Sequence, residues 1–248
     1  MYVDPASIFS KNHVDIIPGV YPFIPMYRRN RKLEQVFLFG IYDAGINRLV
    51  RDGDYGDWWE ILPDIPLFWE QVIPDYPWDV VRHSPRNTRT PDRCLRDSDF
   101  LIEKYYGFPK LMPSLQYLFG DAVNLRQRLR NFHASYPRCL RYGIGNTCKL
   151  RNERKQKEIA RVLLAEVRET DFIHIFGCPT FLFRYLLQHA SFSFSVDSNK
   201  FPWEEVMING KKVRRRVNGK AGRRNALVNY LKKVGYYHDD GKNCRLFK

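Results

Sequence analysis

Three aspartates and a glutamine each follow a short apolar run, at the point where a strand would end. Asp43 closes "VFLFGIYD", Asp75 follows "QVIP", Gln116 follows "KLMPSL", and Asp197 ends the alternating stretch "SFSFSVD". Carboxylates act in enzymes as nucleophiles and as general acids and bases. If the fold gathers these side chains, group-transfer chemistry is the expectation. Taken alone, the "DSN" at the last position is also ordinary turn chemistry.

Charged stretches with helical features separate the apolar runs. The predicted helices cover 121–133, 151–170, 179–190 and 223–235. Apolar residues recur at spacings of three and four in the second of them, and Asp121 is of a type that caps helix N-termini. An earlier run, 14–24, is a candidate first strand. Strands that alternate with helices predict a parallel α/β fold.

Two parallel α/β architectures compete. A doubly wound sheet normally carries a glycine-rich phosphate turn after its first strand, and the sequence has none there. A (β/α)8 TIM-like barrel places its working residues at the carboxyl ends of many strands, and this matches the pattern above. We therefore expect a barrel catalytic core over residues 1–200. A short basic C-terminal segment, 201–248, would complete or flank the barrel.

The charge of +14 is concentrated near the C-terminus. Residues 200–248 contain fourteen Lys or Arg and only four acidic residues, which accounts for +10 of the total. A basic segment of this kind usually contacts a polyanion, and the alternative is a solvated basic surface without a partner. A membrane partner is not expected, because no strongly amphipathic helix accompanies the cluster and no apolar run approaches 18 residues.

The five cysteines are scattered singly, so reduced thiols inside a cell are expected rather than a disulfide framework. No two cysteines have the spacing of a zinc knuckle. The first residues lack the basic-then-apolar layout of a signal peptide. These features predict a cytoplasmic location, which for a viral protein is the cytoplasm of its host.

Six short motifs occur in a recognisable order: "YDAG", "VIPDYPWD", "PSLQ", "YGIGN", "HIFG" and "SVDS". In this order they resemble the tRNA-guanine transglycosylase superfamily, and most of all its short branch that acts on DNA, the phage and bacterial DNA-guanine transglycosylases. The resemblance covers roughly residues 36–200. It implies a (β/α)8 barrel that exchanges guanine for a 7-deazaguanine such as 7-cyano-7-deazaguanine. It further implies a covalent aspartyl-sugar intermediate, with no cofactor and no metal.

The resemblance also implies a role for each motif residue. Asp197 stands at the position of the nucleophile, Asp43 at that of a general acid/base, and Asp75 where the family recognises the Watson–Crick edge of the purine. Other positions resemble base-contacting ones: Gln116, Gly143 and Gly145. Three aromatic residues flank the motifs and are candidates for stacking on the base: Tyr42, Tyr76 and Phe108. We interpret His174 of "HIFG" as a packed, hydrogen-bonded core residue.

The basic C-terminal segment is predicted to contact phosphates without recognising bases. The residues predicted to do so are Lys211, Lys212, Arg214, Arg215, Arg216, Arg223 and Arg224. The basic loop 84–93 is either a further phosphate contact or an ordinary surface loop.

The substrate implied is DNA, together with a free 7-deazaguanine base. The tRNA-acting members of the superfamily carry a CxCxxC…His zinc site after the nucleophile, and here only His238 and Cys244 follow Asp197. This departure favours DNA over tRNA. A tRNA-guanine transglycosylase without the zinc module, a non-catalytic nucleic-acid-binding barrel and a glycosylase that only removes the base remain as alternatives. The oligomeric state stays open.

Overall fold

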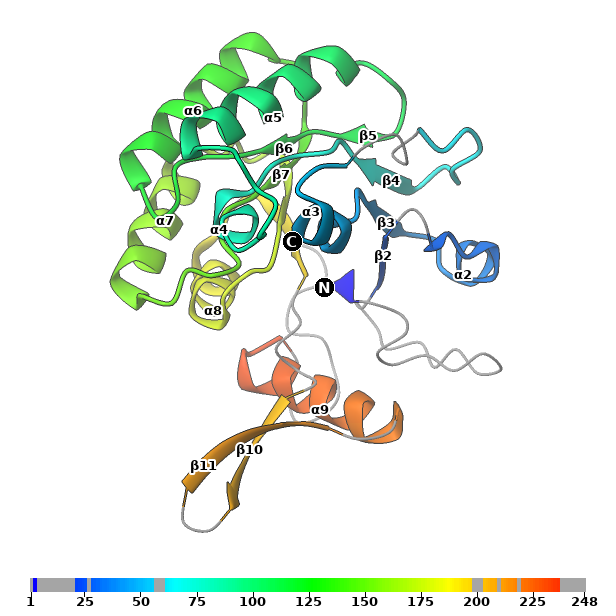
Figure 1. The fold of residues 1–248 in the computed structure, drawn as a ribbon, viewed down its shortest axis with the longest axis vertical. Coiled ribbons are helices and arrows are strands. Elements are labelled where there is room, and N and C mark those ends of the chain that lie inside the picture. Colours follow the sequence, from blue (N-terminus) through cyan, green and yellow to red (C-terminus); the bar gives the residue numbers. More distant parts are fainter. Residues whose placement is uncertain are drawn as a thin grey trace.

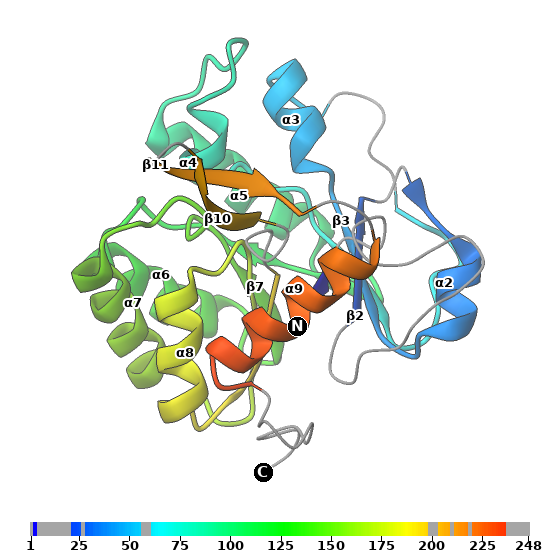
Figure 2. The same cartoon turned by 90° about the horizontal axis from the view of Figure 1, so that it is seen from below.

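The computed structural model describes residues 2–3, 21–25, 28–55, 61–197, 203–208, 211–217 and 220–236 (Figure 1). Parallel strands form the centre of this part of the chain, and helices lie outside them (Figures 1 and 2). Strands and helices alternate along the sequence from β2 to α8. The prediction of a parallel α/β fold is therefore confirmed.

The strands belong to two parallel sheets. The first has the order β1 (Tyr2–Val3), β2 (Tyr21–Pro25), β3 (Gly40–Asp43), β4 (Trp69–Val72) and β5 (Leu111–Met112). The second has the order β6 (Ser114–Leu115), β7 (Arg141–Ile144), β8 (Phe172–Ile175) and β9 (Ser193–Val196). In both sheets the spatial order follows the order along the chain, because each crossover leads to the next strand of the sheet.

The two sheets meet at Pro113, between β5 and β6. The Ile73 N–H donates to the Met112 carbonyl at 2.9 Å, and the Gly143 N–H donates to the Pro113 carbonyl at 2.7 Å. One extended segment, 111–115, therefore pairs with β4 through its first residues and with β7 through its last. With this segment counted as one strand, the described strands occupy eight positions from β1 to β9.

Helices connect the strands and cover the sheets from outside. They are α2 (Arg31–Val36), α3 (Ile46–Asp52), α4 (Trp78–Val81), α5 (Pro91–Tyr105), α6 (Ala122–Ser135), α7 (Glu153–Glu166), α8 (Thr180–His189) and α9 (Lys220–Lys233). The four predicted helices correspond to α6–α9, with ends shifted by up to four residues. The predicted N-cap is also observed, because the Asp121 side chain accepts a hydrogen bond from the Asn124 N–H at 2.9 Å.

Alternate residues of each strand face two different environments. Ile173 and Ile175 of β8 and Val196 of β9 belong to the main core, together with apolar side chains of α6, α7 and α8. The residues between them, His174 and Ser195, point to the opposite side of the sheet and contact each other. The polar half of the alternating stretch therefore lies on the inner face, away from the covering helices.

The strands curve around this inner face. The ring of Phe23 on β2 stacks on the ring of His174 on β8, with centroids 5.6 Å apart. The two strands are five positions apart in the strand order. Because neighbouring strands are about 4.8 Å apart, a flat sheet would separate them by roughly 24 Å. A strongly curved wall, compatible with a TIM-like fold, brings them face to face.

The C-terminal segment contributes to the same core. Leu227 and Leu231 of α9 and Val234 directly after it are buried in the main hydrophobic cluster, and the ring of Tyr236 lies 6.1 Å from that of Phe183 on α8. Before α9, β10 (Trp203–Ile208) and β11 (Lys211–Arg216) form an antiparallel hairpin. The hairpin extends away from the sheets (Figure 1).

Candidate active site

The carboxyl ends of the parallel strands lie at one edge of the wall, and the chemically reactive motif residues lie there with them. Asp43 is the last residue of β3, Asp75 comes three residues after β4, and Asp197 directly follows β9. The negative charge of Asp197 acts on the pKa of Asp43, and that of Asp43 acts on Asp75. The fold thus gathers three carboxylates that are far apart in the sequence.

The start of α3 holds Asp43 in place. Its Oδ2 accepts hydrogen bonds from the N–H groups of Gly45 at 3.0 Å and Ile46 at 3.3 Å. Gly45 has a φ of 97°, a conformation that glycine adopts without strain. Burial raises the pKa of the Asp43 carboxyl to about 6, and the charge of Asp197 adds to the increase, while the two backbone hydrogen bonds oppose it.

Asp75 is held by side chains in and directly after the extended segment 111–115. Its Oδ2 accepts hydrogen bonds from the Ser114 hydroxyl and the Gln116 amide nitrogen. Burial raises the pKa of Asp75 to about 7; the two hydrogen bonds lower it, and the charge of Asp43 raises it further. Gln116 is fully buried, and its Oε1 has no hydrogen-bond partner among the described residues. A buried unpaired acceptor beside a carboxylate is a costly arrangement unless a ligand supplies donors.

Asp197 is held by β8 and the turn that follows it. Its Oδ1 accepts a hydrogen bond from the Gly177 N–H at 2.7 Å and lies 3.3 Å from His174 Nε2. Its backbone carbonyl accepts from the Cys178 N–H at 3.1 Å. The Asp197 side chain is 15% exposed, so it is ordered by protein donors and still accessible.

The three carboxylates share one arrangement. In each of them one oxygen is fixed by two donors. The second oxygen of each has no hydrogen-bond partner within the described part of the chain. These oxygens are Oδ1 of Asp43, Oδ1 of Asp75 and Oδ2 of Asp197. Such a set can attack an electrophilic carbon, transfer a proton and accept hydrogen bonds from a bound base.

Ser195, His174 and Asp197 are the residue types of a hydrolase triad. Here, however, the serine is the buried residue and the aspartate is the accessible one. His174 Nδ1 lies 2.9 Å from Ser195 Oγ, and Nε2 faces Asp197. Ser195 is the deeper residue on β9 and is buried, whereas Asp197 lies at the open edge. The accessible group is therefore the carboxylate, and the arrangement does not present a serine nucleophile.

Gly143 and Gly145 permit close packing on the inner face. A Cβ at Gly143 would overlap the ring of Phe176, and a Cβ at Gly145 would overlap the amide of Gln116. Gly145 also donates its N–H to the Leu115 carbonyl at 3.0 Å. The structure thus places Gly145 directly against one predicted base-contacting side chain and covers Gly143 with an aromatic ring.

Two of the three aromatic candidates, Tyr76 and Tyr42, pack against other side chains of the protein. The Tyr76 ring is buried between Tyr55 and the Arg89 guanidinium, which lies 4.0 Å from its centroid, and its hydroxyl donates to Asp54 at 2.8 Å. Tyr42 is fully buried on the helix-facing side, where its ring packs on Trp69. These contacts give both side chains a packing role.

Phe108 lies before β5, at the amino end of the central segment, and therefore at the opposite edge from the carboxylates. Two other aromatic residues, Phe23 and Phe176, lie on the inner face. Phe23 stacks on His174, and Phe176 meets the same imidazole edge-on at 4.7 Å. These two rings were not among the predicted stacking residues.

The predicted phosphate contacts lie largely outside the described side chains. The structure describes the backbone of β11 and α9, but not the side chains of Lys211, Lys212, Arg214, Arg215, Arg216 and Arg224. Arg223 is partly buried, and its Nε has no hydrogen-bond partner among the described residues.

In the basic loop 84–93, Arg89 is held within the protein. It pairs with Asp97 at 2.7 Å and Asp54 at 2.8 Å. These bonds give this side chain a structural role in the loop.

The sequence pattern did not single out two residues that contact Asp75, because their types are common inside folded proteins. Ser114 lies in "PSLQ" two residues before Gln116, and strand alternation places both on the inner face. Tyr55 donates its hydroxyl to the Asp75 carbonyl at 2.8 Å from a loop without periodicity. Alternation was a usable signal for Ser114, whereas nothing in the local sequence marks Tyr55.

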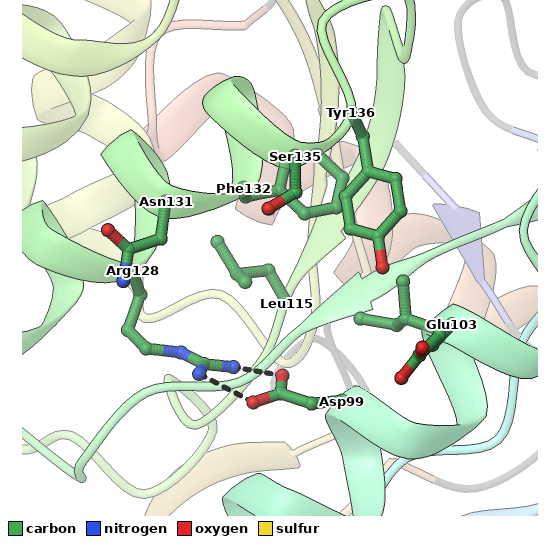
Figure 3. A pocket seen from close by; sticks show the side chains of 9 residues that line it. Asp99, Glu103, Leu115, Arg128, Asn131, Phe132, Ser135 and Tyr136 are labelled. Carbon is green, nitrogen blue, oxygen red and sulfur yellow. Dashed lines mark hydrogen bonds and ion pairs between the residues drawn. The ribbon is translucent and has the colours of Figure 1, made fainter.

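A groove of about 260 Å³ lies between α5 and α6, on the outer side of the wall (Figure 3). Arg128 pairs there with Asp99, and the dashed lines in Figure 3 mark this contact. The Arg128 Nε also donates to the Gln116 carbonyl at 3.0 Å. The ion pair in this groove therefore helps to fix the backbone of a residue whose side chain contacts Asp75.

No known family model and no curated protein matches the chain. Across the part of the chain that the structure describes, no helix has the length and apolar character to cross a membrane. Within the same residues, no cluster of three or more His, Cys, Asp or Glu side chains is arranged to hold a metal ion.

Proposed function

We propose that this protein is a guanine transglycosylase that exchanges guanine in DNA for a 7-deazaguanine base. The observation that carries the proposal is the convergence of Asp43, Asp75 and Asp197 at one strand edge, each with one fixed oxygen and one oxygen that has no hydrogen-bond partner among the described residues. The resemblance of the ordered motifs to the DNA-guanine transglycosylases supports the same activity. Base exchange needs three carboxylate functions: a nucleophile, a proton carrier and a purine acceptor.

We infer further that the two sheets close into a (β/α)8 barrel. The eight strand positions and the contact between Phe23 and His174 across the inner face support closure. In this architecture α9 is the helix after the last strand, consistent with its burial against α8. The segment 201–248 then completes the barrel layer and adds a basic hairpin to it.

In the proposed reaction Asp197 attacks C1′ of the target nucleotide. The bond from Asp197 oxygen to C1′ forms as the C1′–N9 bond breaks, and the bonding electron pair leaves with the guanine. The transition state has oxocarbenium character, which a neighbouring carboxylate stabilises. The covalent intermediate keeps the sugar attached to the protein until the second base attacks C1′ and releases Asp197.

Asp43 and Asp75 perform the proton transfer and the base selection in this proposal. A carboxyl with a pKa of about 6 can donate a proton to the departing guanine and accept one from the incoming base near neutral pH. Ionised Asp75 would accept hydrogen bonds from the guanine N1–H and amino group. Adenine lacks this donor pair and would leave buried acceptors unpaired, at a cost of about 1–3 kcal/mol each.

DNA is the proposed polymer, and the basic hairpin is the proposed contact with its phosphates. Trp203, the first residue of β10, follows Asp197 by six residues, so the hairpin starts within about 21 Å of the proposed nucleophile. Lys and Arg side chains at this distance can bind the backbone of a strand whose target base has left the stack.

The test is exchange of isotopically labelled guanine into nucleic acid by the purified protein. DNA and tRNA are offered separately, and the product is analysed as nucleosides by mass spectrometry, with 7-cyano-7-deazaguanine as the alternative incoming base. Asp197→Asn should abolish incorporation, because losing the nucleophile raises the barrier by several kcal/mol at about 1.4 kcal/mol per tenfold. The matched control is Asp92→Asn on the exposed start of α5.

The outcomes separate the alternatives. Incorporation into DNA by the wild type and Asp92→Asn, but not by Asp197→Asn, would support the proposal. Incorporation only into tRNA would move the substrate to tRNA, and loss of guanine without incorporation would indicate a glycosylase. Nucleic-acid binding without either reaction would indicate a non-catalytic barrel, and Asp197→Asn with wild-type exchange would refute the assignment of the nucleophile.

A further inference from the structure

His174 is held on the inner face by contacts of both ring nitrogens and of the ring itself. It is fully buried, its Nδ1 lies 2.9 Å from Ser195 Oγ, and its ring stacks on Phe23 with an interplanar angle of 14°. Phe176 meets the ring edge-on. Ring contacts on two sides and a hydrogen bond at one nitrogen leave the imidazole one orientation, in which Nε2 faces Asp197.

The hydrogen bonds favour one protonation pattern for this chain of residues. Asp197 Oδ1 is an acceptor, so the facing Nε2 must carry the proton. In a neutral imidazole Nδ1 is then an acceptor, and the Ser195 hydroxyl can donate to it. In this arrangement each of the three groups has a complementary hydrogen-bond partner.

The Gly177 N–H and His174 Nε2–H bind the same oxygen of Asp197. Gly177 reaches this position in a conformation with φ of 59°, and a Cβ there would lie 2.6 Å from the Cβ of Cys148. Two fixed donors on Oδ1 set the carboxylate plane. Oδ2 accepts no hydrogen bond from the described residues. Its electron pairs are therefore available to attack carbon.

We propose that His174 is a positioning residue for Asp197, and that Oδ2 is the oxygen that bonds to the sugar. The inference rests on the proposed function, because it takes Asp197 as the nucleophile. In the reaction the Oδ2–C1′ bond forms, the C1′–N9 electron pair leaves with guanine, and Oδ1 becomes the ester carbonyl. His174 keeps its proton throughout and touches neither the base nor the sugar.

Two amide variants separate positioning from packing. In His174→Gln the side-chain amide can reach the place of Nε2 and donate to Asp197. In His174→Asn the shorter amide lies near the place of Nδ1 and leaves Oδ1 one donor short. We expect His174→Gln to retain most of kcat and His174→Asn to lose about tenfold to a hundredfold, the effect of one hydrogen bond to a charged group. KM for the base should be unchanged in both.

A wild-type kcat in His174→Asn would overturn the proposal, and so would equal losses in the two variants with equal melting temperatures. Ser195→Ala is the companion control. It removes the bond to Nδ1 and leaves Nε2–H in place, so its loss in kcat should be smaller than that of His174→Asn.

A spectroscopic measurement tests the same geometry without any assay of exchange. Long-range ¹H–¹⁵N correlation spectra of the wild type with ¹⁵N-labelled histidine report the tautomer of each imidazole, and His174→Gln identifies the signal. We expect the neutral Nε2–H tautomer for His174. An Nδ1–H tautomer would refute the positioning role even if the protein exchanges guanine. If the Nε2–H tautomer is found and no exchange occurs, the proposed function fails while the held conformation of Asp197 stands.

Discussion

Asp43 and Asp75 keep their protons at a pH at which exposed aspartates have lost them. Burial is the main cause in both, and each is further affected by a neighbouring carboxylate. In the unfolded chain both ionise near pH 4. At these two carboxyls the folded state therefore binds more protons than the unfolded state between pH 4 and pH 7, and their contribution to the free energy of unfolding falls as the pH rises.

Asp75→Asn should stabilise the protein in a pH-dependent manner. The amide cannot ionise, so the variant escapes the cost of a buried charge above pH 7 while its carbonyl oxygen still accepts from Ser114. We expect an increase in the free energy of unfolding on the order of 1–3 kcal/mol at pH 8, and none at pH 4. Urea denaturation at the two pH values measures this. Exposed Asp92→Asn is the control, and an equal change at both pH values would contradict the prediction.

Gly145 is required by the close approach of Gln116 rather than by its own backbone conformation. Gly145→Ala should displace the Gln116 amide from Asp75, because the new Cβ would overlap it. The expected result is overpacking that lowers the free energy of unfolding by about 1–3 kcal/mol. It should also raise KM for the incoming base.

The double variant Gly145→Ala/Gln116→Ala tests the cause, because it removes the overlapping side chain. If the effects of the single variants Gly145→Ala and Gln116→Ala are coupled, the double variant loses less free energy of unfolding than the sum of the two single losses. Strict additivity would show that Gly145 matters for another reason.

At the scale of elements, the register of β10 and β11 divides the basic residues between two faces of the hairpin. Trp203 pairs with Arg216, Glu205 with Arg214, and Met207 with Lys212, so these six residues share one face. The other pairs, which form the second face, are Glu204 with Arg215, Val206 with Val213, and Ile208 with Lys211. The second face carries three aliphatic residues, so the first is the better candidate for phosphate contact.

Replacing Lys212, Arg214 and Arg216 together by Ala should weaken DNA binding most. Each phosphate contact on duplex DNA contributes about −0.9 to the slope of log affinity against log salt, so the slope should flatten by about two to three units. The variant Lys211→Ala/Arg215→Ala, on the second face, is the control and should flatten it less. A salt titration of affinity measures both, and equal slopes per charge removed would show that the two faces are equivalent.

The sequence pattern predicted the helices α6–α9 and the positions at which the strands end, because apolar periodicity and capping residues act locally. It also predicted which carboxylates gather, since parallel strands share an edge. It could not predict that Tyr76 turns its ring toward Arg89 or that His174 faces Asp197. Those contacts join residues that are distant in sequence, and only the curvature of the wall decides them.

At the scale of the whole molecule, α9 is part of the main core although it follows a basic hairpin. Leu231→Ala should therefore lower the free energy of unfolding by about 2–5 kcal/mol, the cost of a buried cavity. Exposed Leu67→Ala is the matched control and should change it by less than about 0.5 kcal/mol. Chemical denaturation compares them. A wild-type stability for Leu231→Ala would indicate that the C-terminal segment folds separately from the strands.

Pro113 divides the proposed chemistry as well as the wall. Asp43 ends and Asp75 follows a strand of the sheet before it, whereas Gln116, Gly145 and Asp197 follow strands of the sheet after it. The half-chain before Pro113 thus carries the proposed proton carrier and the proposed purine acceptor, and the half-chain after it carries the proposed nucleophile. Neither half holds a complete set of reacting groups. The complete set forms only where the two halves meet, so an isolated fragment of either half would be inactive in base exchange.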